Sequence, residues 1–475
     1  MPFLHIFFVA IFMPKNKKGV VFLEEIQWKQ KKTDNMQPTI LEKLFKLSER
    51  NTNAKTEILA GITTFMTVSY IIFVNPLILS EAGIPKEAAL AATIYSTVFC
   101  TLLMALWANF PVVVGPGMGL NAFFTYTVVI GQGLSWQTGL GAVFISGVCF
   151  FILSVTGIRE KLVNGVPNTL KSAMGVGIGL FIAFIGFKNA GIIVANESNF
   201  VGLGNITSGG PLLAVIGLVI AAVLMALRVK GSLIISIFAI ALISMATGFS
   251  AVPTSIHDIA SLSIPSIADT FMHMDLKGAI AYGIFSVIFS FTIVELFDSL
   301  ATLISLSKKA NLVDKNGKIP NLNRALTADA IGTMVSAMFG STALNTYVEN
   351  ATGIAEGGRT GLKAFIVAIL FALGLFFAPL VNIIPSVATA PILILIGSLM
   401  LSEIKNIDFE DFTNVVPAFL TIVMMPLTYS IAEGMAFGFI SYTLLKLVTG
   451  RYKEVHWIMY FVSIAFIINF IMLNH

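Results

Sequence analysis

The sequence predicts an all-α polytopic membrane protein, with fourteen transmembrane spans arranged as two inverted repeats of seven. Of its 475 residues, 56% are hydrophobic and only 11% are charged, whereas about a quarter of the residues of a typical soluble domain are charged. Apolar runs long enough to cross a bilayer follow one another along most of the chain. Two of these runs, at residues 112–131 and 341–357, are interrupted by glycine and polar residues. We therefore expect both of these spans to be discontinuous, with short extended segments.

Each half of the chain is expected to hold seven spans. Those of the first half lie at residues 57–80, 88–109, 112–131, 136–157, 168–190, 211–228 and 231–249. A polar connection at 251–277 leads to the second set, at residues 278–306, 323–339, 341–357, 361–384, 386–403, 411–429 and 431–449. The two repeats thus comprise residues 57–250 and 278–450. The C-terminal apolar helix at 451–475 has no counterpart in the first half, and it either spans the membrane or lies on it.

The N-terminal region differs from the rest of the chain. Within residues 1–35, a short apolar run precedes Lys15 and further lysines, which is the reverse of the order in a signal peptide. We expect this segment to be a non-native or mis-assigned extension, with translation starting at Met36; a signal peptide is the alternative. Residues 36–56 are polar and basic, and they predict a cytoplasmic lead-in at the membrane surface.

Three features recur in the same order in both halves. Residues 119–124 (GLNAFF) resemble residues 343–348 (ALNTYV), a proline opens both the fifth and the twelfth span, and two short apolar helices close each half. Because each repeat holds an odd number of spans, the repeats must cross the membrane in opposite directions. With a cytoplasmic N-terminus, lysine and arginine, including Lys363 and Lys446 at the span ends, gather in the even-numbered connections, as the positive-inside rule requires.

The composition also argues against several classes of function. A net charge of +4 does not indicate a nucleic-acid partner, and the basic residues are concentrated in the connections. The two cysteines lie in apolar spans, and the five histidines are scattered without metal-ligand spacing. We therefore expect no metal, no cofactor and no enzymatic activity. Membrane lipid surrounds such a protein, and the sequence leaves open whether it forms a homodimer.

A polar group lies within the eighth span. Glu295 and Asp298 are three residues apart, so they share one helix face, and Thr292 adds a hydroxyl nearby. Two carboxylates in an apolar span are costly to bury in the ionised form, so at least one is expected to take up a proton readily. Such a carboxyl can carry a proton together with a solute. The alternative is that one of the pair, more naturally Asp298, only braces the neighbouring discontinuous span.

The tenth span holds a second polar group. Residues 340–342 suit an extended segment, and a half-helix is expected to begin between Asn345 and Tyr347. Its unpaired N–H groups would then face the membrane midplane, with Glu349 in the first turn and Asn350 next to it. In one interpretation Glu349 accepts a hydrogen bond from a ligand. In the other, Asn345 and Glu349 only cap the half-helix.

The third span is interrupted in a similar way. Glycines and a proline at residues 115–119 break the helix, and Asn121 opens a new one. Asn121 is either a helix cap or a ligand contact, and Phe123 is either a packing residue or a platform for a planar ligand. Paired interruptions of this kind in two halves of a chain point to a transporter's binding site. No Arg or Lys is expected inside a span, which favours a flat neutral heterocycle rich in N–H donors over a strongly anionic ligand.

Four segments carry a family resemblance, at residues 53–65, 115–121, 295–298 (ELFD) and 346–353 (TYVENATG). From Met36 to its C-terminus the chain resembles the nucleobase–cation symporter-2 superfamily of xanthine, uracil and purine carriers, and above all the AzgA-like adenine/guanine/hypoxanthine permeases. The resemblance implies a core domain (spans one to four and eight to eleven) that moves against a gate domain (spans five to seven and twelve to fourteen). It also implies substrate contacts at Asn121, Glu295 and Glu349, supported by Asp298, and coupling to protons.

The expected function is proton-coupled uptake of purine nucleobases (hypoxanthine, guanine or adenine) across the cytoplasmic membrane by alternating access. The residues expected to bind the substrate are Asn121, Phe123, Glu295, Glu349 and Asn350. Those expected to support the site or couple it to protons are Thr292, Glu295, Asp298 and Asn345. The spacing from Glu349 to Gly353 is one residue longer than in the xanthine branch, which favours purines. A xanthine or uracil permease, an anion exchanger on the same fold and a channel for neutral solutes stay open as alternatives.

Overall fold

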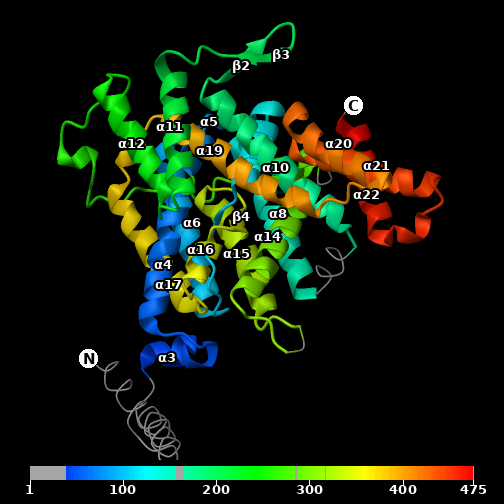
Figure 1. Cartoon of the computed structure of the whole chain (residues 1–475), viewed down its shortest axis with the longest axis horizontal. Coiled ribbons are helices and arrows are strands. Elements are labelled where there is room, and N and C mark those ends of the chain that lie inside the picture. Colours follow the sequence, from blue (N-terminus) through cyan, green and yellow to red (C-terminus); the bar gives the residue numbers. More distant parts are fainter. Residues whose placement is uncertain (1–38, 157–164, 284–286, 316, 474–475) are drawn as a thin grey trace, which may run out of the picture.

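The computed structural model describes residues 39–156, 165–283, 287–315 and 317–473 (Figure 1). The expected extension at residues 1–35 lies outside these residues. Within them, the regular structure consists of helices and two short antiparallel strand pairs. The predicted all-α architecture is confirmed.

The first half opens with two surface elements, α3 (Ile40–Phe45) and η1 (Ser48–Arg50). Its apolar elements then follow in the order α4 (Ala54–Val68), α5 (Ile71–Glu81), α6 (Lys86–Leu106), β1 (Val114–Pro116), α7 (Met118–Ala122), the π-helical η2 (Phe123–Gly131), α8 (Trp136–Thr156), α10 (Asn168–Asn189), α11 (Gly209–Ala226) and α12 (Ser232–Ala246). The strands β2 (Ile193–Asn196) and β3 (Phe200–Leu203) form a largely exposed hairpin between α10 and α11. The sequence did not predict this hairpin.

The second half repeats this order. The connection contains η3 (Ile256–Asp258), and the elements that follow are α13 (Leu276–Gly283), α14 (Phe289–Lys309), α15 (Leu322–Phe339), β4 (Leu344–Thr346), α16 (Asn350–Ala355), α17 (Gly361–Gly374), η5 (Leu375–Phe377), α18 (Leu380–Ile383), α19 (Ser386–Met400), η6 (Leu401–Asn406), α20 (Phe412–Thr428) and α21 (Ile431–Val448). The chain ends with η7 (Tyr452–Glu454) and α22 (Trp457–Leu473).

The lengths and composition of these helices make the chain a multi-pass membrane protein. Among the described residues, eight helices are long and apolar enough to cross a membrane, and five shorter apolar helices accompany them. The first expected span consists of two segments, α4 and α5, which together run from Ala54 to Glu81. The precise tally of fourteen spans and the boundaries of the two repeats stay predictions.

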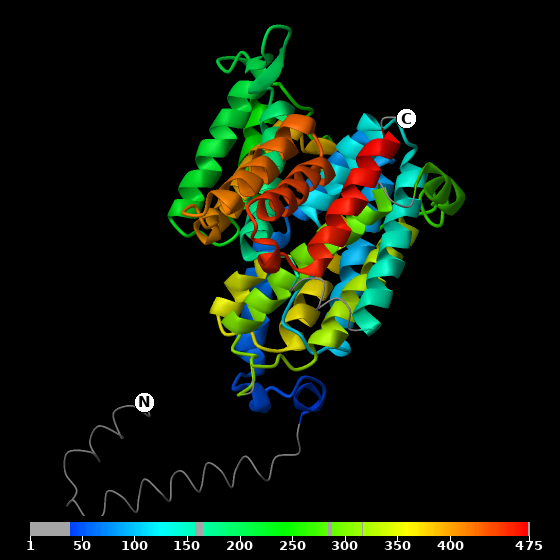
Figure 2. The ribbon, with the colours of Figure 1, turned by 90° about the vertical axis from the view of Figure 1, so that its right-hand side faces the viewer.

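The helices form two groups (Figure 2). The gate group, in which α10, α19 and α20 pack together, also contains α11, α12 and α21. The core group contains α4, α5, α6, α8, α14, α15, α16 and α17, which pack around the two interrupted segments. In Figure 2 the green and orange helices of the gate group lie to one side of the blue, cyan and yellow core group. This division follows the one that the family resemblance implies.

The C-terminal helix α22 contacts both groups. The ring of Phe466 lies 5.3 Å from that of Phe289 on α14 and 5.9 Å from that of Phe439 on α21. Both pairs are close to edge-on, an arrangement that aromatic rings favour. The hydroxyls of Ser463 and Thr443 add a hydrogen bond of 2.8 Å between α22 and α21. α22 therefore lies along the boundary between the core and gate groups.

The two interrupted segments meet in a short antiparallel strand pair. In β1 and β4, Val114 is paired with Thr346, Gly115 with Asn345, and Pro116 with Leu344. Gly340, at φ +100°, ends α15 in a conformation that favours glycine, and the chain continues as an extended segment. A Cβ atom on Gly115 would lie 2.8 Å from Thr97 Oγ1, so only glycine fits there. The predicted extended segments are thus confirmed.

Three expectations about these segments were wrong in detail. The half-helix of the tenth span begins at Asn350, not between Asn345 and Tyr347, because residues 344–346 are held in the strand pair. Asn121 lies inside α7 whereas Asn345 lies in β4, so the two are not equivalent positions. Lys363 and Lys446, expected in connections, are buried in α17 and α21 at 0% and 1% exposure.

Candidate functional site

Glu349 occupies the N-cap position of α16, at the end of the strand pair. Its side chain makes no capping hydrogen bond to the helix. One carboxylate oxygen, Oε1, accepts a hydrogen bond of 3.0 Å from the Tyr70 hydroxyl, which lies between α4 and α5. Glu349 is partly exposed, and its neighbour Val348 is 59% exposed. The interpretation that Glu349 only caps its own helix therefore fails, and the carboxylate remains available to a ligand.

Asp298 lies on α14 and contacts Asn345, which belongs to β4, the strand that precedes Glu349. Asn345 Nδ2 donates a hydrogen bond to its carboxylate, and Ser299 Oγ donates to Asn345 Oδ1 at 2.8 Å. Asn345 thus joins α14 to β4 instead of capping a helix. Asp298 is partly exposed, like Glu349. The bracing role that the sequence allowed for Asp298 matches this contact, and its partial exposure also leaves it accessible.

Glu295, one turn earlier on α14, has a different environment. It is completely buried, and its Oε1 accepts a hydrogen bond of 2.6 Å from Thr333 on α15. The same Thr333 oxygen accepts the backbone N–H of Leu344 at 3.1 Å. Through Thr333, Glu295 is therefore connected to the backbone of β4. Its predicted role as a direct substrate contact stays a prediction.

The first-half residues form a closed network of neutral side chains. Asn121 is fully buried, its Nδ2 donates to Asn75 Oδ1 at 2.5 Å, and its Oδ1 accepts from the Thr342 hydroxyl. Asn75 Nδ2 in turn donates to Thr93 Oγ1 at 2.7 Å and to Ser341 Oγ at 3.3 Å. The network ties α5, α6 and α7 to the segment that precedes β4. Asn121 is more than a helix cap, because its amide links both halves of the chain.

The remaining predicted residues are also engaged with protein. Phe123 is 1% exposed and its ring lies 4.9 Å from that of Phe291 on α14. The Thr292 hydroxyl donates to the Ile288 carbonyl of its own helix at 2.8 Å. Asn350 is fully buried, and its side chain accepts from Val113 N at 2.9 Å and donates to Val113 O at 3.0 Å. The structure therefore connects most of the predicted polar residues to the strand pair, whereas Thr292 bonds only to its own helix; of the three predicted carboxylates, Glu349 and Asp298 are partly exposed.

Sequence reasoning missed several residues of this region. Tyr70 and Asn75 are polar residues of the first span, and Thr333 belongs to the ninth. Asp329 on α15 is completely buried. The rule that an ionisable residue inside a membrane span marks a functional region would have singled out Asp329. Tyr70, Asn75 and Thr333 carry no such signal, since isolated polar residues are common in spans.

Contacts between the core and gate groups include ring pairs, such as Phe73–Phe238 and Phe297–Phe439, and two sets of polar contacts. Near the β2–β3 hairpin, Asn189 of α10 donates hydrogen bonds to the Tyr126 hydroxyl (2.9 Å) and to Glu81 Oε1 (3.1 Å). The Thr127 hydroxyl donates to the Tyr429 carbonyl at 2.7 Å, and the rings of Tyr126 and Tyr429 lie 5.7 Å apart. On the other side of the gate group, Lys230 and Glu356 form an ion pair at 2.7 Å, with side chains 53% and 42% exposed. The first contact is partly buried and made of several bonds, whereas the second is one solvated pair.

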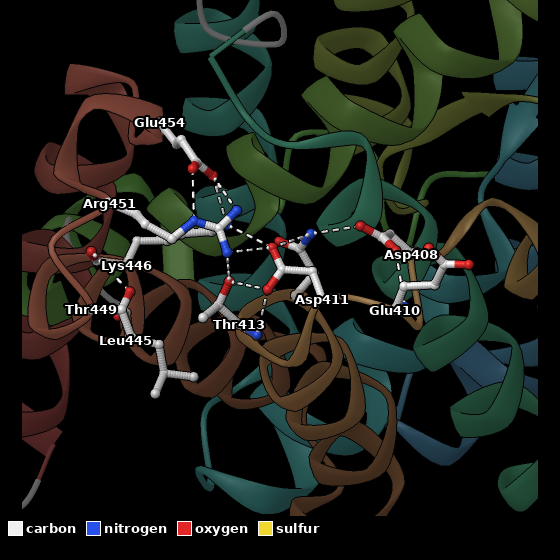
Figure 3. A network of polar contacts seen from close by, with 10 residues as sticks. Asp408, Glu410, Asp411, Thr413, Leu445, Lys446, Thr449, Arg451 and Glu454 are labelled. Carbon is white, nitrogen blue, oxygen red and sulfur yellow. Dashed lines mark hydrogen bonds and ion pairs between the residues drawn. The ribbon is translucent and has the colours of Figure 1, made fainter.

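A separate network of charges joins the ends of α20 and α21 (Figure 3). Asp411 caps α20 by accepting from Thr413 N at 3.0 Å, and it also receives Lys446 Nζ at 3.1 Å and Arg451 Nη1 at 2.8 Å. Glu454 bonds to the same two cations at 2.8 and 2.7 Å. This network lies within the gate group, and it contains none of the residues at the strand pair. Among the described residues no cluster of His, Cys, Asp and Glu suits a metal ion.

Comparison with known proteins places the chain among permeases. The family model for xanthine/uracil permeases, described as the permease family, matches residues 55–437. A putative permease of Methanocaldococcus jannaschii is 48% identical over 91% of this chain and 99% of its own length. A guanine/hypoxanthine permease of Bacillus subtilis is 43% identical, over 90% of this chain and 100% of its own length. An adenine permease of Escherichia coli is 41% identical, over 91% and 97% respectively.

Solved structures with the same fold come from anion transporters. The transmembrane domain of a cyanobacterial bicarbonate transporter matches with a TM-score of 0.59 at 16% identity, over 81% of this chain and 97% of that one. The anion transporter SLC26A9 matches with a TM-score of 0.60 at 12% identity, over 90% of this chain and 71% of that one. These likenesses confirm the predicted fold, which is the inverted-repeat architecture of that transporter group.

Proposed function

This chain belongs to the xanthine/uracil permease family, and from that premise we propose that it takes up purine nucleobases across the cytoplasmic membrane together with protons. Relatives at 40–43% identity are named as guanine/hypoxanthine and adenine permeases. Each of these relatives matches this chain over nearly its whole length. A relationship this complete supports a common class of substrate.

The observation that carries the proposal is the pair of partly exposed carboxylates, Glu349 and Asp298, on either side of β4. A purine base presents ring N–H groups, and adenine and guanine add an exocyclic amine. Carboxylate oxygens accept hydrogen bonds from such donors. In our proposal Glu349 accepts from the base, and Asn345 holds Asp298 in place to accept from a second donor or to receive the proton.

The proton-coupling part of the proposal rests on the position of these carboxylates in a membrane protein. An ionised carboxylate in this environment is costly unless it is hydrogen-bonded or paired. Glu349 has the Tyr70 hydroxyl as partner, and Asp298 has the Asn345 amide, so both partners are neutral. Binding of one proton together with one neutral base would remove a charge from the region before the core group moves.

Alternating access is proposed to break and form the two sets of polar contacts between the core and gate groups. The contact around Asn189, Tyr126 and Tyr429 closes one side, whereas the solvated Lys230–Glu356 pair is easily broken. With the N-terminus in the cytoplasm, as the distribution of lysine and arginine favours, the closed side faces outward. The structure then corresponds to a form in which the site is reached from the cytoplasm.

The test uses the purified protein in liposomes. Radiolabelled hypoxanthine uptake is measured with and without an inward proton gradient for the wild type and for Glu349→Gln. The substitution removes a charge-assisted acceptor and is expected to lower uptake about 10- to 100-fold. Glu410→Gln, at an exposed carboxylate in the loop before α20, serves as the matched control. Uptake that stays undiminished and proton-dependent in Glu349→Gln removes Glu349 from the mechanism.

A competition panel separates this function from its rivals. Adenine and guanine, xanthine, uracil and other pyrimidines, and inorganic anions are added in excess over labelled hypoxanthine. Competition by adenine and guanine alone is expected, because two carboxylates beside the strand pair disfavour anions. Competition by bicarbonate or chloride would favour an anion exchanger on the same fold. Uptake that never exceeds equilibration would favour a channel.

A further inference from the structure

Lys363 is a buried cation next to the proposed site. It lies in the first turn of α17 and is 0% exposed. Burying an ammonium group is costly unless its three donors are satisfied. Here Nζ donates to the carbonyl of Pro111 at 2.9 Å, to the carbonyl of Asn350 at 3.0 Å and to Asn350 Oδ1 at 3.2 Å. All three acceptors belong to the interrupted segments.

The path of the lysine side chain requires two glycines. A Cβ atom on Gly353 would lie 2.7 Å from Lys363 Cε, and one on Gly358 would lie 2.8 Å from Lys363 Cδ. At Gly358 the lysine is the nearest obstacle, so a larger residue there would displace the methylene groups, whereas a Cβ atom on Gly353 would meet Thr64 Oγ1 and the Ala60 carbonyl even before the lysine. The missing side chains of Gly353 and Gly358 therefore leave the space through which the Lys363 side chain reaches Asn350.

Asn350, which accepts from Lys363, also forms hydrogen bonds with the first-half segment. Its side chain pairs with both backbone groups of Val113, the residue before β1, and its Nδ2 also donates to the Tyr347 carbonyl at 2.8 Å. Lys363 holds Pro111 on the same segment. Lys363 and Asn350 thus connect the two interrupted segments to each other, at the residue that directly follows Glu349 in the sequence.

Glu57 lies next to Lys363 and holds the start of its helix. Glu57, in the first turn of α4, is also 0% exposed. Its carboxylate accepts the backbone N–H groups of Arg359 (2.7 Å), Thr360 (3.3 Å) and Lys363 (3.2 Å). Glu57 therefore caps α17, the helix from which Lys363 extends. The Glu57 carboxylate thus holds the start of α17, and the Lys363 ammonium group holds the two interrupted segments.

We propose that Lys363 is a positioning residue for the substrate site, which acts through Asn350 to keep Glu349 at its place beside β4. This inference rests on the proposed function. Loss of the ammonium group removes a donor from three buried acceptors, of which Asn350 Oδ1 keeps the Val113 N–H, and the start of α16 is then free to shift. A displacement of about 1 Å in a binding residue can cost two orders of magnitude in activity. Lys363 itself need not touch the substrate.

The experiment measures purine affinity and thermal stability in detergent-purified protein. Lys363→Met keeps the methylene chain and removes the charge, and we expect the Kd for hypoxanthine to rise about 10- to 100-fold. Lys446→Met is the matched control, because Lys446 is equally buried but lies in the gate network around Asp411. It is expected to lower Tm and to leave the Kd within about twofold of the wild type. A Kd that is unchanged in Lys363→Met overturns the proposal.

A double-mutant cycle tests whether the effect passes through Asn350. Asn350→Ala and Lys363→Met should be non-additive, since each breaks the same link. Additive losses of affinity would overturn the positioning role even if Lys363→Met weakens binding. If Lys363→Met does not fold, Gly358→Ala decides the question, because it crowds Cδ and retains the charge. An increase of about threefold or more in the Kd of Gly358→Ala supports the proposal, and an unchanged Kd overturns it.

The outcome also distinguishes the two proposals from each other. If the wild type binds no purine, the proposed function fails. If the wild type binds and all Lys363 and Gly358 variants bind equally well, only the role of Lys363 fails.

Discussion

The two interrupted segments share a backbone plan but differ in chemistry. In the first half, Asn121 is completely buried and its amide is used by Asn75 and Thr342. In the second half, Glu349 and Asp298 are partly exposed and each has a neutral partner, Tyr70 or Asn345. The polar groups of the first-half segment are thus bonded within the protein, whereas the carboxylates of the second half are partly exposed.

The physical reason lies in what each group can tolerate. An amide that donates and accepts within a neutral network is satisfied without water or ligand. A carboxylate with a single neutral donor keeps lone pairs that accept further N–H groups. An inverted repeat duplicates the backbone geometry, whereas the side chains of the two copies are free to diverge.

The largest expected effect comes from placing a charge in the neutral network. Asn121→Asp removes the N–H donor to Asn75 and buries a carboxylate oxygen against the Asn75 amide oxygen, with the Thr342 hydroxyl as its remaining donor. We expect the free energy of unfolding to fall by about 3 kcal/mol or more. Thermal unfolding of the detergent-solubilised protein checks this, with exposed Asn205→Asp as control. A variant as stable as the wild type would show that the first-half network tolerates charge after all.

Removing a charge from the second half is expected to leave stability nearly unchanged and to lower uptake strongly. Asp298→Asn can keep a hydrogen bond with Asn345, so stability is expected to change by less than about 1 kcal/mol. Hypoxanthine uptake in liposomes is expected to fall about 10- to 100-fold, because an acceptor or proton site is lost. Asp408→Asn, at an exposed carboxylate outside the core group, is the control. Normal uptake by Asp298→Asn would reduce Asp298 to a brace for β4.

A smaller effect is expected from the partner of Glu349. Tyr70→Phe removes only the hydroxyl that donates to Glu349 at 3.0 Å. A hydrogen bond to a charged group contributes about 1.5–3 kcal/mol, so hypoxanthine affinity should change by about tenfold as the carboxylate is reoriented. Tyr95→Phe loses a hydroxyl bonded to the Pro265 carbonyl and serves as control. Equal affinities in both variants would mean that Tyr70 does not orient Glu349.

The smallest expected effect is on the pH dependence of Tm, and it comes from the charge network of Asp411 and Glu454, which lies away from the proposed site. Hydrogen bonds from Arg451 and Lys446 lower the pKa of Glu454 from 4.5 to about 2, and the hydroxyl of Thr413 together with these cations lowers the pKa of Asp411. A lowered carboxyl pKa means that the stabilisation is present above the ordinary value and is lost as the pH falls toward the folded value. Glu454→Gln should lower Tm by about 2 °C at pH 7, with the difference shrinking below pH 4.5 and vanishing toward pH 2. A difference that does not shrink between pH 5 and about pH 2 would mean that the charge of Glu454 is not the cause.

Much of the architecture could be predicted because it follows from local composition. Apolar runs of bilayer length predicted the helices, and glycine-rich polar interruptions predicted the extended segments that became β1 and β4. Glu349 and Asp298 stood out as ionisable residues in apolar surroundings, and the motifs around them indicated the family that the comparisons confirm.

Other features depended on contacts between residues far apart in the chain. The donor of Glu349 is Tyr70, 279 residues away, and the acceptor Pro111 of Lys363 is 252 residues away. Lys363 and Lys446 looked like connection charges, because a lysine near the end of a span usually extends to the membrane surface. The sequence by itself determined which residues are costly to bury in a membrane. Only the tertiary structure decided which of them are buried, because that depends on whether a distant segment supplies the matching donor or acceptor.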